Sequence, residues 1–219
     1  MARFMDFEYE LINSGVKINK YLGSETSVNI PSKIENLSVT EMGDCAFCEC
    51  NSLKSVTIPD SVKEIGWGTF DRCRELTSIS IPDSVMKIGV GAFIDCTSLK
   101  TIILPNGLKE IGTGTFTGCS SLTNITMPTS LKEIGMSAFE ECTSLTKIDI
   151  PDSVTDIGDC AFYRCRALTS ITMPDSLKEI ASYAFADCIS LKNITLPSSN
   201  IKISPDAFLN CNVSIDLAK

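Results

Sequence analysis

The sequence predicts one elongated β-solenoid, a stack of coils that each use 23 residues. Three observations predict it. In every unit a cysteine, from Cys50 to Cys211, lies three residues after a phenylalanine. Prolines recur every 23 residues from Pro59 to Pro197. The phenylalanines themselves recur every 23 residues, at Phe47, Phe70, Phe93, Phe116, Phe139, Phe162, Phe185 and Phe208. A fixed period of this length is typical of repeat proteins whose units share one core.

Each unit begins with a short strand. Val56 and Ile58 alternate with Thr57, so the two apolar side chains are expected to face the core and the hydroxyl to face outward. Leu53 joins them inside. Pro59 ends the strand because it has no N–H to donate to a ladder.

The second half of each unit returns the chain to the start of the next coil. Val62 and Ile65 are predicted to point inward, and the two charged residues between them outward. Gly66 suits a tight turn against the next coil. The stretch from Thr69 to Cys73 is expected to form a short 3₁₀ or irregular turn. One coil cannot offset the backbone entropy of ordering its residues, roughly 1–2 kcal/mol each, so stability must arise from the array.

The two ends of the chain depart from the repeat. Residues 7–20 alternate apolar and polar side chains around the turn signal Asn13-Ser14-Gly15, which predicts a hairpin that caps the core. We therefore expect a hairpin cap over residues 1–27 and a solenoid of about eight coils over residues 28–219, in one structural domain. Five extra residues lie within 32–38. At the other end Val213, Ile215 and Leu217 alternate as a last strand, whose edge could contact another chain.

Composition excludes several classes of function. The net charge is −8 and no Lys/Arg cluster occurs, so neither nucleic acid nor an anionic membrane surface is an expected partner. No apolar stretch is long enough for a signal peptide or for membrane insertion. The chain has no histidine, which removes serine–histidine and cysteine–histidine mechanisms. No catalytic residue, metal or cofactor is predicted, and the chain is not expected to be an enzyme.

At this point one unit carries a recognisable pattern. The run from Ile58 to Gly66, Ile-Pro-Asp-Ser-Val-Lys-Glu-Ile-Gly, followed by Phe70-x-x-Cys73, resembles the BspA-like (treponemal-type) leucine-rich repeats over nearly the whole chain. The resemblance implies a right-handed, curved parallel β-solenoid without shared catalytic residues. It also implies a surface protein of gut or oral bacteria or of protozoan parasites, some of which are adhesins for host matrix proteins. The many unpaired cysteines favour a cytoplasmic location instead, so cell surface or secreted and cytoplasmic both stay open.

The outward side chains of the strands are the first candidate binding surface. By analogy with other leucine-rich repeats they form the concave face, which is the usual binding surface of such proteins. The alternative is that serine and threonine simply suit exposed strand positions. The residues are Ser55, Thr57, Ser78, Ser80, Thr101, Ile103, Asn124, Thr126, Lys147, Asp149, Ser170, Thr172, Asn193 and Thr195.

The cysteines raise a second possibility. Eight of them share one position in the repeat and are expected to be a buried ladder of free thiols. Cys45, Cys48 and Cys50 form a Cys-x-x-Cys-x-Cys cluster, with Cys48 at an exposed position, so a metal or redox role is the alternative there. Cys160 replaces a small turn residue.

Charged and variable residues complete the candidates. Two adjacent columns, one of lysines and one of carboxylates, are expected to pair as charge ladders on a solvated edge: Lys63, Lys109, Lys132 and Lys178, beside Glu64, Glu110, Glu133, Asp156 and Glu179. Acidic residues after the phenylalanines could hold calcium only if they converged: Asp95, Glu140, Glu141 and Asp187. Large residues that vary between turns could be specific to a ligand or reflect neutral drift: Trp67, Ile94, Met136, Tyr163 and Tyr183.

The sequence therefore predicts a non-catalytic protein-interaction module, adhesin-like, that binds a protein or matrix macromolecule. The alternative is an intracellular scaffold that self-associates through its C-terminal edge.

Overall fold

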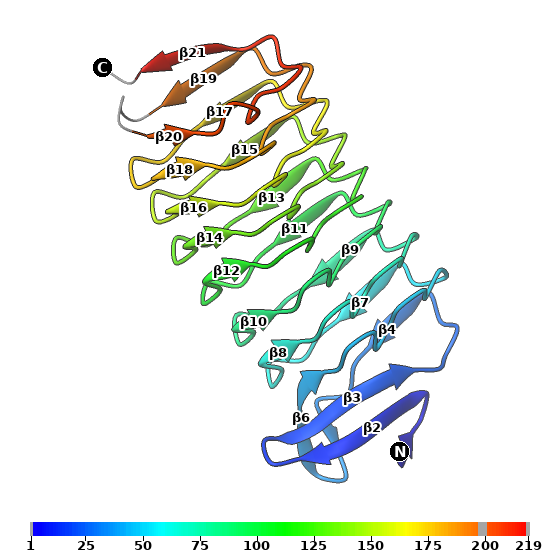
Figure 1. Cartoon of the computed structure of the whole chain (residues 1–219). Coiled ribbons are helices and arrows are strands. Elements are labelled where there is room, and N and C mark those ends of the chain that lie inside the picture. The colour runs from blue at the N-terminus through cyan, green and yellow to red at the C-terminus, as the bar shows by residue number, and fades with distance from the viewer. Residues whose placement is uncertain (1, 197–200, 218–219) are drawn as a thin grey trace.

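The chain folds as the predicted stack of coils. The structure, a computed structural model, describes residues 2–196 and 201–217, and within them every regular element is a strand. Figure 1 shows the coils following one another along a single axis, from the hairpin at the N-terminal end to the last strand. Equivalent residues of successive coils are 23 positions apart in the strand pairing, so the parallel β-solenoid is confirmed.

One side of the stack carries the predicted strands. These strands pair in parallel, in three groups that follow one another along the axis: β4–β7–β9, β11–β13 and β15–β17–β19–β21. Their bounds are β4 (Ser27–Asn29), β7 (Ser55–Thr57), β9 (Ser78–Ser80), β11 (Thr101–Ile103), β13 (Asn124–Thr126), β15 (Lys147–Asp149), β17 (Ser170–Thr172), β19 (Asn193–Leu196) and β21 (Ser214–Leu217).

A second row of parallel strands, two residues long in most coils, lies on another side. The sequence predicted only which side chains point inward there, because two residues are too few for an alternation to be recognised. The bounds are β6 (Leu37–Met42), β8 (Glu64–Ile65), β10 (Lys87–Ile88), β12 (Glu110–Ile111), β14 (Glu133–Ile134), β16 (Asp156–Ile157), β18 (Glu179–Ile180) and β20 (Lys202–Ile203).

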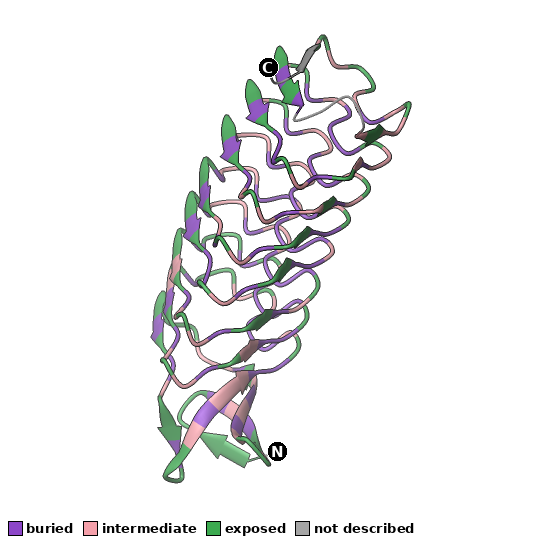
Figure 2. Ribbon diagram, turned by 90° about the vertical axis from the view of Figure 1, so that its left-hand side faces the viewer, coloured by how far each residue is buried: buried purple, intermediate pink, exposed green. Residues whose placement is uncertain are grey.

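The core runs the length of the stack between the two rows. Figure 2 shows buried and exposed residues alternating along the coils. The phenylalanines from Phe47 to Phe185 are fully buried and lie face to face, with neighbouring ring centroids 5.0–5.4 Å apart. Phe208, in the last coil, is only half-buried. Each coil thus covers the aromatic ring of its neighbour, as the stability of the array requires.

The turns that contain the phenylalanines are irregular rather than 3₁₀. In most coils two residues have a left-handed main chain, one two positions before the phenylalanine and one two positions after it. In the fifth repeat these are Ser137 (φ 53°) and Glu141 (φ 59°). Cys160 holds the first of these positions one coil later (φ 57°), where three other coils have glycine.

The N-terminal hairpin is present. β2 (Phe7–Ile12) and β3 (Gly15–Tyr21) pair antiparallel, and β1 (Ala2–Phe4) adds a strand to β2. The ring of Tyr21 stacks on Phe47 with centroids 5.1 Å apart, so the hairpin covers the first coil of the core. The division at residue 27 stays a prediction.

The five extra residues near the first coil form a second, smaller hairpin. β5 (Lys33–Ile34) pairs antiparallel with β6. Glu35 and Asn36 between them are both left-handed, with φ of 51° and 65°. Two such residues form the tight turn that the twist of a hairpin favours.

The last coil is closed by β21, which pairs in parallel with β19 as the alternation from Val213 predicted. Pro197 of the repeat lies outside the described residues, as do the side chains of Ile215 and Leu217.

Candidate functional site

The strand face consists of the outward side chains of β7, β9, β11, β13, β15, β17 and β19. Thirteen of its fourteen residues are exposed, as predicted. Ser55 is half-buried, because its hydroxyl donates to the Ser27 hydroxyl oxygen at 2.8 Å. The residues, from coil to coil, are Ser55 and Thr57, Ser78 and Ser80, Thr101 and Ile103, Asn124 and Thr126, Lys147 and Asp149, Ser170 and Thr172, and Asn193 and Thr195.

The chemistry of the strand face is mostly hydroxyl and amide. Two features interrupt it. Ile103 places an apolar side chain in the open, 69% exposed. Lys147 and Asp149 place opposite charges on the same strand. The strand pairing is interrupted between β9 and β11 and between β13 and β15, and a shallow hollow lies over each interruption, of about 330 and 410 Å³. The face can therefore offer hydrogen bonds over a long, open surface, with small irregularities that could receive a side chain.

Six of the eight cysteines predicted to form the ladder are fully buried, whereas Cys50 and Cys211 at its two ends are half-buried. The buried six are Cys73, Cys96, Cys119, Cys142, Cys165 and Cys188, and all are free thiols. Each donates its S–H to the main-chain carbonyl of the phenylalanine in the preceding coil, at 3.1–3.2 Å. Burial raises the pKa of Cys119 to about 12. These thiols are held protonated and have a structural role.

The cluster of Cys45, Cys48 and Cys50 differs from the six buried cysteines of the ladder in being half-buried. Cys48 donates to a carboxylate oxygen of Asp71 at 3.8 Å, and burial together with that carboxylate raises the pKa of Cys48 to about 11. A redox nucleophile or metal ligand needs an accessible thiolate, which this environment disfavours. No group of three or more potential metal ligands occurs within the described residues.

Two of the four carboxylates after the phenylalanines, Glu141 and Asp187, belong to a ladder of polar contacts along the turns. Arg164 reaches Glu141 at 2.8 Å and Asp187 at 3.6 Å, and Asn210 donates to Asp187 at 2.7 Å. The bonds from Asn210 and Arg164 lower the pKa of the Asp187 carboxyl. Arg72 pairs with Glu49 at 3.1 Å in the same way. The ladder neutralises charges between coils instead of collecting them for calcium.

The expected pairing of the lysine column with the carboxylate column is wrong. Within the described residues, the ion pairs of this edge run along the carboxylate column itself, from Lys87 to Glu64 at 2.6 Å and from Lys202 to Glu179 at 2.7 Å. Side chains one coil apart on the same column lie directly above each other, whereas residues adjacent in the sequence diverge. The coils between these two pairs have no lysine in the column.

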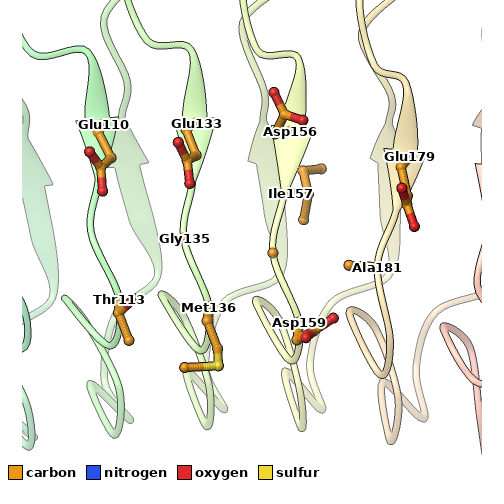
Figure 3. A pocket seen from close by; sticks show the side chains of 11 residues that line it. Glu110, Thr113, Glu133, Gly135, Met136, Asp156, Ile157, Asp159, Glu179 and Ala181 are labelled. Carbon is orange, nitrogen blue, oxygen red and sulfur yellow. The ribbon is translucent and has the colours of Figure 1, made fainter.

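These unpaired carboxylates line a groove that the sequence did not predict. We call it the outer groove. One wall is the carboxylate column on β12, β14, β16 and β18, and the other is the turn column that includes Met136 and Asp159 (Figure 3). The floor is a column of small residues such as Gly135 and Gly158. A side chain on Gly158 would come within 2.7 Å of the Met136 nitrogen, so the floor must stay small for the coils to approach.

The outer groove has two parts. The acidic part has a volume of about 470 Å³, and an adjoining part of about 280 Å³ lies beside β10. Both are lined by Glu110. Met86 and Val90 in the second part are 55% and 47% exposed. The sequence feature that could have predicted the groove is a column of glycines flanked by two columns of outward side chains. These columns form a groove only when the coils are stacked.

The variable turn residues do not form one surface. Trp67 and Met136 are exposed in the turn column, three coils apart, and Tyr183 lies in the next column. Ile94 and Tyr163 are half-buried. No helix of the described residues is long and apolar enough to cross a bilayer.

Comparison with known proteins gives a consistent result. The sequence profile described as BspA type leucine rich repeat region (6 copies) matches residues 17–142 and 109–215. No curated protein sequence matches the chain.

Solved structures agree with the profile. The leucine-rich repeat protein of T. pallidum is 31% identical, over 92% of this chain and 85% of that one, with a TM-score of 0.64. A leucine-rich cell surface protein of Faecalibacterium prausnitzii A2-165 is 27% identical, over 100% and 76%, with a TM-score of 0.66. A leucine-rich repeat protein of Bacteroides ovatus, 24% identical over 99% and 71% with a TM-score of 0.65, shares the fold.

Proposed function

Because the chain belongs to the BspA-type leucine-rich repeat family, we propose that it is a non-catalytic protein-interaction module, adhesin-like, that binds a protein or matrix macromolecule through its strand face. The observation that carries the proposal is a continuous exposed face, two outward side chains per strand over seven strands. The F. prausnitzii relative is a cell surface protein by its description, which supports the same location for this chain.

The chemistry of the strand face favours a large, extended partner over a small molecule. Small ligands need concave, mostly apolar pockets, whereas this face is an open sheet. Its hydroxyls and amides can each contribute a modest hydrogen bond, about 0.5–1.5 kcal/mol net, so useful affinity requires many contacts over a large area. The face has no aromatic or arginine side chain to act as a hot spot. We therefore expect moderate affinity that depends on several coils together.

The absence of histidine and the family both favour a binding role over catalysis. Four of the seven residues in the second column of the strand face are threonine (Thr57, Thr126, Thr172 and Thr195), which suits an extended contact surface better than a reaction centre.

The test is binding of the purified chain to an array of extracellular-matrix proteins, measured by surface plasmon resonance. The strand-face variant is Ile103→Ser with Lys147→Ala and Asp149→Ala. Its matched control is Ile189→Ser with Arg74→Ala and Glu75→Ala, which changes an exposed isoleucine and two exposed opposite charges outside both the strand face and the outer groove. We expect the strand-face variant to bind at least fivefold more weakly and the control to be unchanged. Equal binding by both variants, or no binding to any matrix protein, contradicts the proposal. Surface labelling of intact cells tests the location.

The second candidate function is an intracellular scaffold that self-associates through the terminal coil. It is favoured by Phe208, Cys211 and Val213, which are half-buried where the corresponding residues of inner coils are covered. Light scattering at high concentration, on the native chain and on a chain ending at residue 212, tests it. A native chain that stays monomeric rules out this function.

A further inference from the structure

The outer groove combines two kinds of surface along one line. Its acidic part carries the column Glu110, Glu133, Asp156 and Glu179, with Asp159 on the opposite wall. No lysine or arginine lines this part. The strands that carry the column are about 4.8 Å apart, so the carboxylates follow one another at nearly that spacing. Figure 3 shows the column on one wall and Met136 and Asp159 on the other.

The acidic column is unfavourable to the folded chain on its own. Like charges directly opposite each other on paired strands destabilise a sheet. Lysine relieves this at both ends, where Lys87 pairs with Glu64 and Lys202 with Glu179. Glu110, Glu133 and Asp156 between them make no ion pair in the described residues. Lys132 lines neither part of the groove, and Lys109 lines only the adjoining part. The middle of the column is therefore a place where a positive charge from another molecule would be favoured.

The other part of the groove is mainly apolar, and the stems of Lys87 and Lys109 also line it. Met86 and Val90 are about half exposed there, and the aliphatic floor includes Leu108. Trp67 occupies the position of Val90 one coil earlier and is 54% exposed. Three large apolar side chains thus lie in the open on neighbouring coils, next to the acidic part. An apolar surface beside a charged one is typical of a docking site for a segment with the complementary order.

We propose that the outer groove binds an extended peptide segment of a partner protein, with lysine or arginine residues in the acidic part and one or two apolar side chains against Met86 and Val90. The groove covers four coil steps from Val90 to Glu179, about 19 Å, which about six residues of extended chain would span. This surface is separate from the strand face. It shares with the proposed function only the premise that the chain binds proteins.

The chain provides its own reporter for this binding. Trp67 is the single tryptophan, and its main chain lies against Gly89, which lines the apolar part of the groove. The probes are two synthetic octapeptides with blocked ends, one with leucine and valine preceding three lysines and one with the order reversed, so that both directions are tested. We expect one of them to bind with one-to-one stoichiometry, to shift the Trp67 emission to shorter wavelength, and to bind more weakly as salt is raised.

The decisive variant is Glu133→Gln with Asp156→Asn, which removes two charges from the middle of the groove without a change of shape. Its matched control is Asp60→Asn with Asp152→Asn, two exposed carboxylates outside the groove. We expect the first to weaken peptide binding about tenfold and the second to leave it unchanged, because each exposed pair contributes modestly. Met86→Ser should reduce both the affinity and the emission shift.

Two results would overturn the inference. One is that neither peptide moves the Trp67 emission. The other is that both double variants weaken binding equally, because the peptides would then respond only to net negative charge. Loss of matrix binding in the strand-face variant, with peptide binding intact, would support the inference and the proposed function separately.

Discussion

The thiol of Cys119 donates to the main-chain carbonyl of Phe93, 3.2 Å away in the preceding coil. The same carbonyl also accepts the main-chain N–H of Cys96 at 3.3 Å. Each rung of the cysteine ladder thus ties one coil to the next while filling the space beside the phenylalanine stack. This explains why the cysteine keeps its distance of three residues from the phenylalanine, since only that spacing places the thiol over the carbonyl of the coil before it.

Stability should fall at alkaline pH because of this ladder. Burial raises the pKa of Cys119 to about 12, above its ordinary value of 9.0, so the stabilisation is complete below pH 9 and is lost as pH rises toward 12. We expect the urea midpoint to be level from pH 7 to 8.5 and to fall between pH 9 and 11. Replacing Cys119 and Cys142 by alanine should give a less stable chain with a shallower fall. A midpoint that is constant to pH 11 would contradict the burial of the thiols.

Thiol labelling should separate the cysteines into two classes. At pH 7.5 we expect a thiol-specific aromatic disulfide reagent to spare the six fully buried residues from Cys73 to Cys188 and to react, slowly, with the half-buried ones: Cys45, Cys48, Cys50, Cys160 and Cys211. All eleven should react in urea. Absorbance counts the modified thiols, and peptide mass spectrometry identifies them. Rapid labelling of Cys119 in the native chain would rule out the ladder.

The phenylalanine stack should be most sensitive in its middle. Phe116→Ala removes a fully buried ring between two neighbours at 5.4 Å, and a cost of about 3–5 kcal/mol in the free energy of unfolding is expected. Phe208→Ala acts on a half-buried ring that, among the described residues, stacks on Phe185 alone, and it should cost clearly less. Urea unfolding followed by far-ultraviolet circular dichroism measures both. Equal costs would mean that the terminal coil is covered in solution, for example by another chain.

The period of the sequence was sufficient to predict the coils, the inward and outward faces of Val56, Thr57 and Ile58, and the cysteine ladder. It could not predict the ion pairs, because Glu64 selects its partner across coils, from Lys87, and not from its sequence neighbour Lys63. The outer groove was missed for the same reason: Glu133 and Met136 become two walls only after the coils stack. Binding of a partner to the strand face depends also on a second molecule, so the repeat alone cannot predict it.

At the left-handed position before each phenylalanine, replacing a glycine should destabilise the chain, and introducing a glycine should stabilise it. Gly114 has a φ of 62°, and a side chain there would make only ordinary van der Waals contacts with Thr117 and Ile94, so Gly114→Ala strains only the main chain and should cost about 1 kcal/mol. Ser137 has the same role with a φ of 53°, so Ser137→Gly should stabilise by a smaller amount, since glycine also makes the unfolded chain more flexible. Shifts of the urea midpoint in the same direction for both variants would show that the main chain is not left-handed there.

A serine hydroxyl that recurs at one position of the repeat donates a hydrogen bond between coils. This bond can be removed in one coil and added in another. Ser84 donates to the carbonyl of Val62 at 2.7 Å, and Ser130 donates to the carbonyl of Leu108 at 2.6 Å. Gly107 occupies this position in the intervening coil and cannot donate. Ser84→Ala should therefore cost about 1 kcal/mol. Gly107→Ser should add the missing bond to Val85, because the one close neighbour of the new side chain is the flexible end of Met86 at 2.6 Å. Ser80→Ala, on the exposed strand face, is the control and should change the urea midpoint little. If Gly107→Ser destabilises the chain as much as Ser84→Ala does, the bond between coils contributes nothing, and the serine of this position is retained by the turn alone.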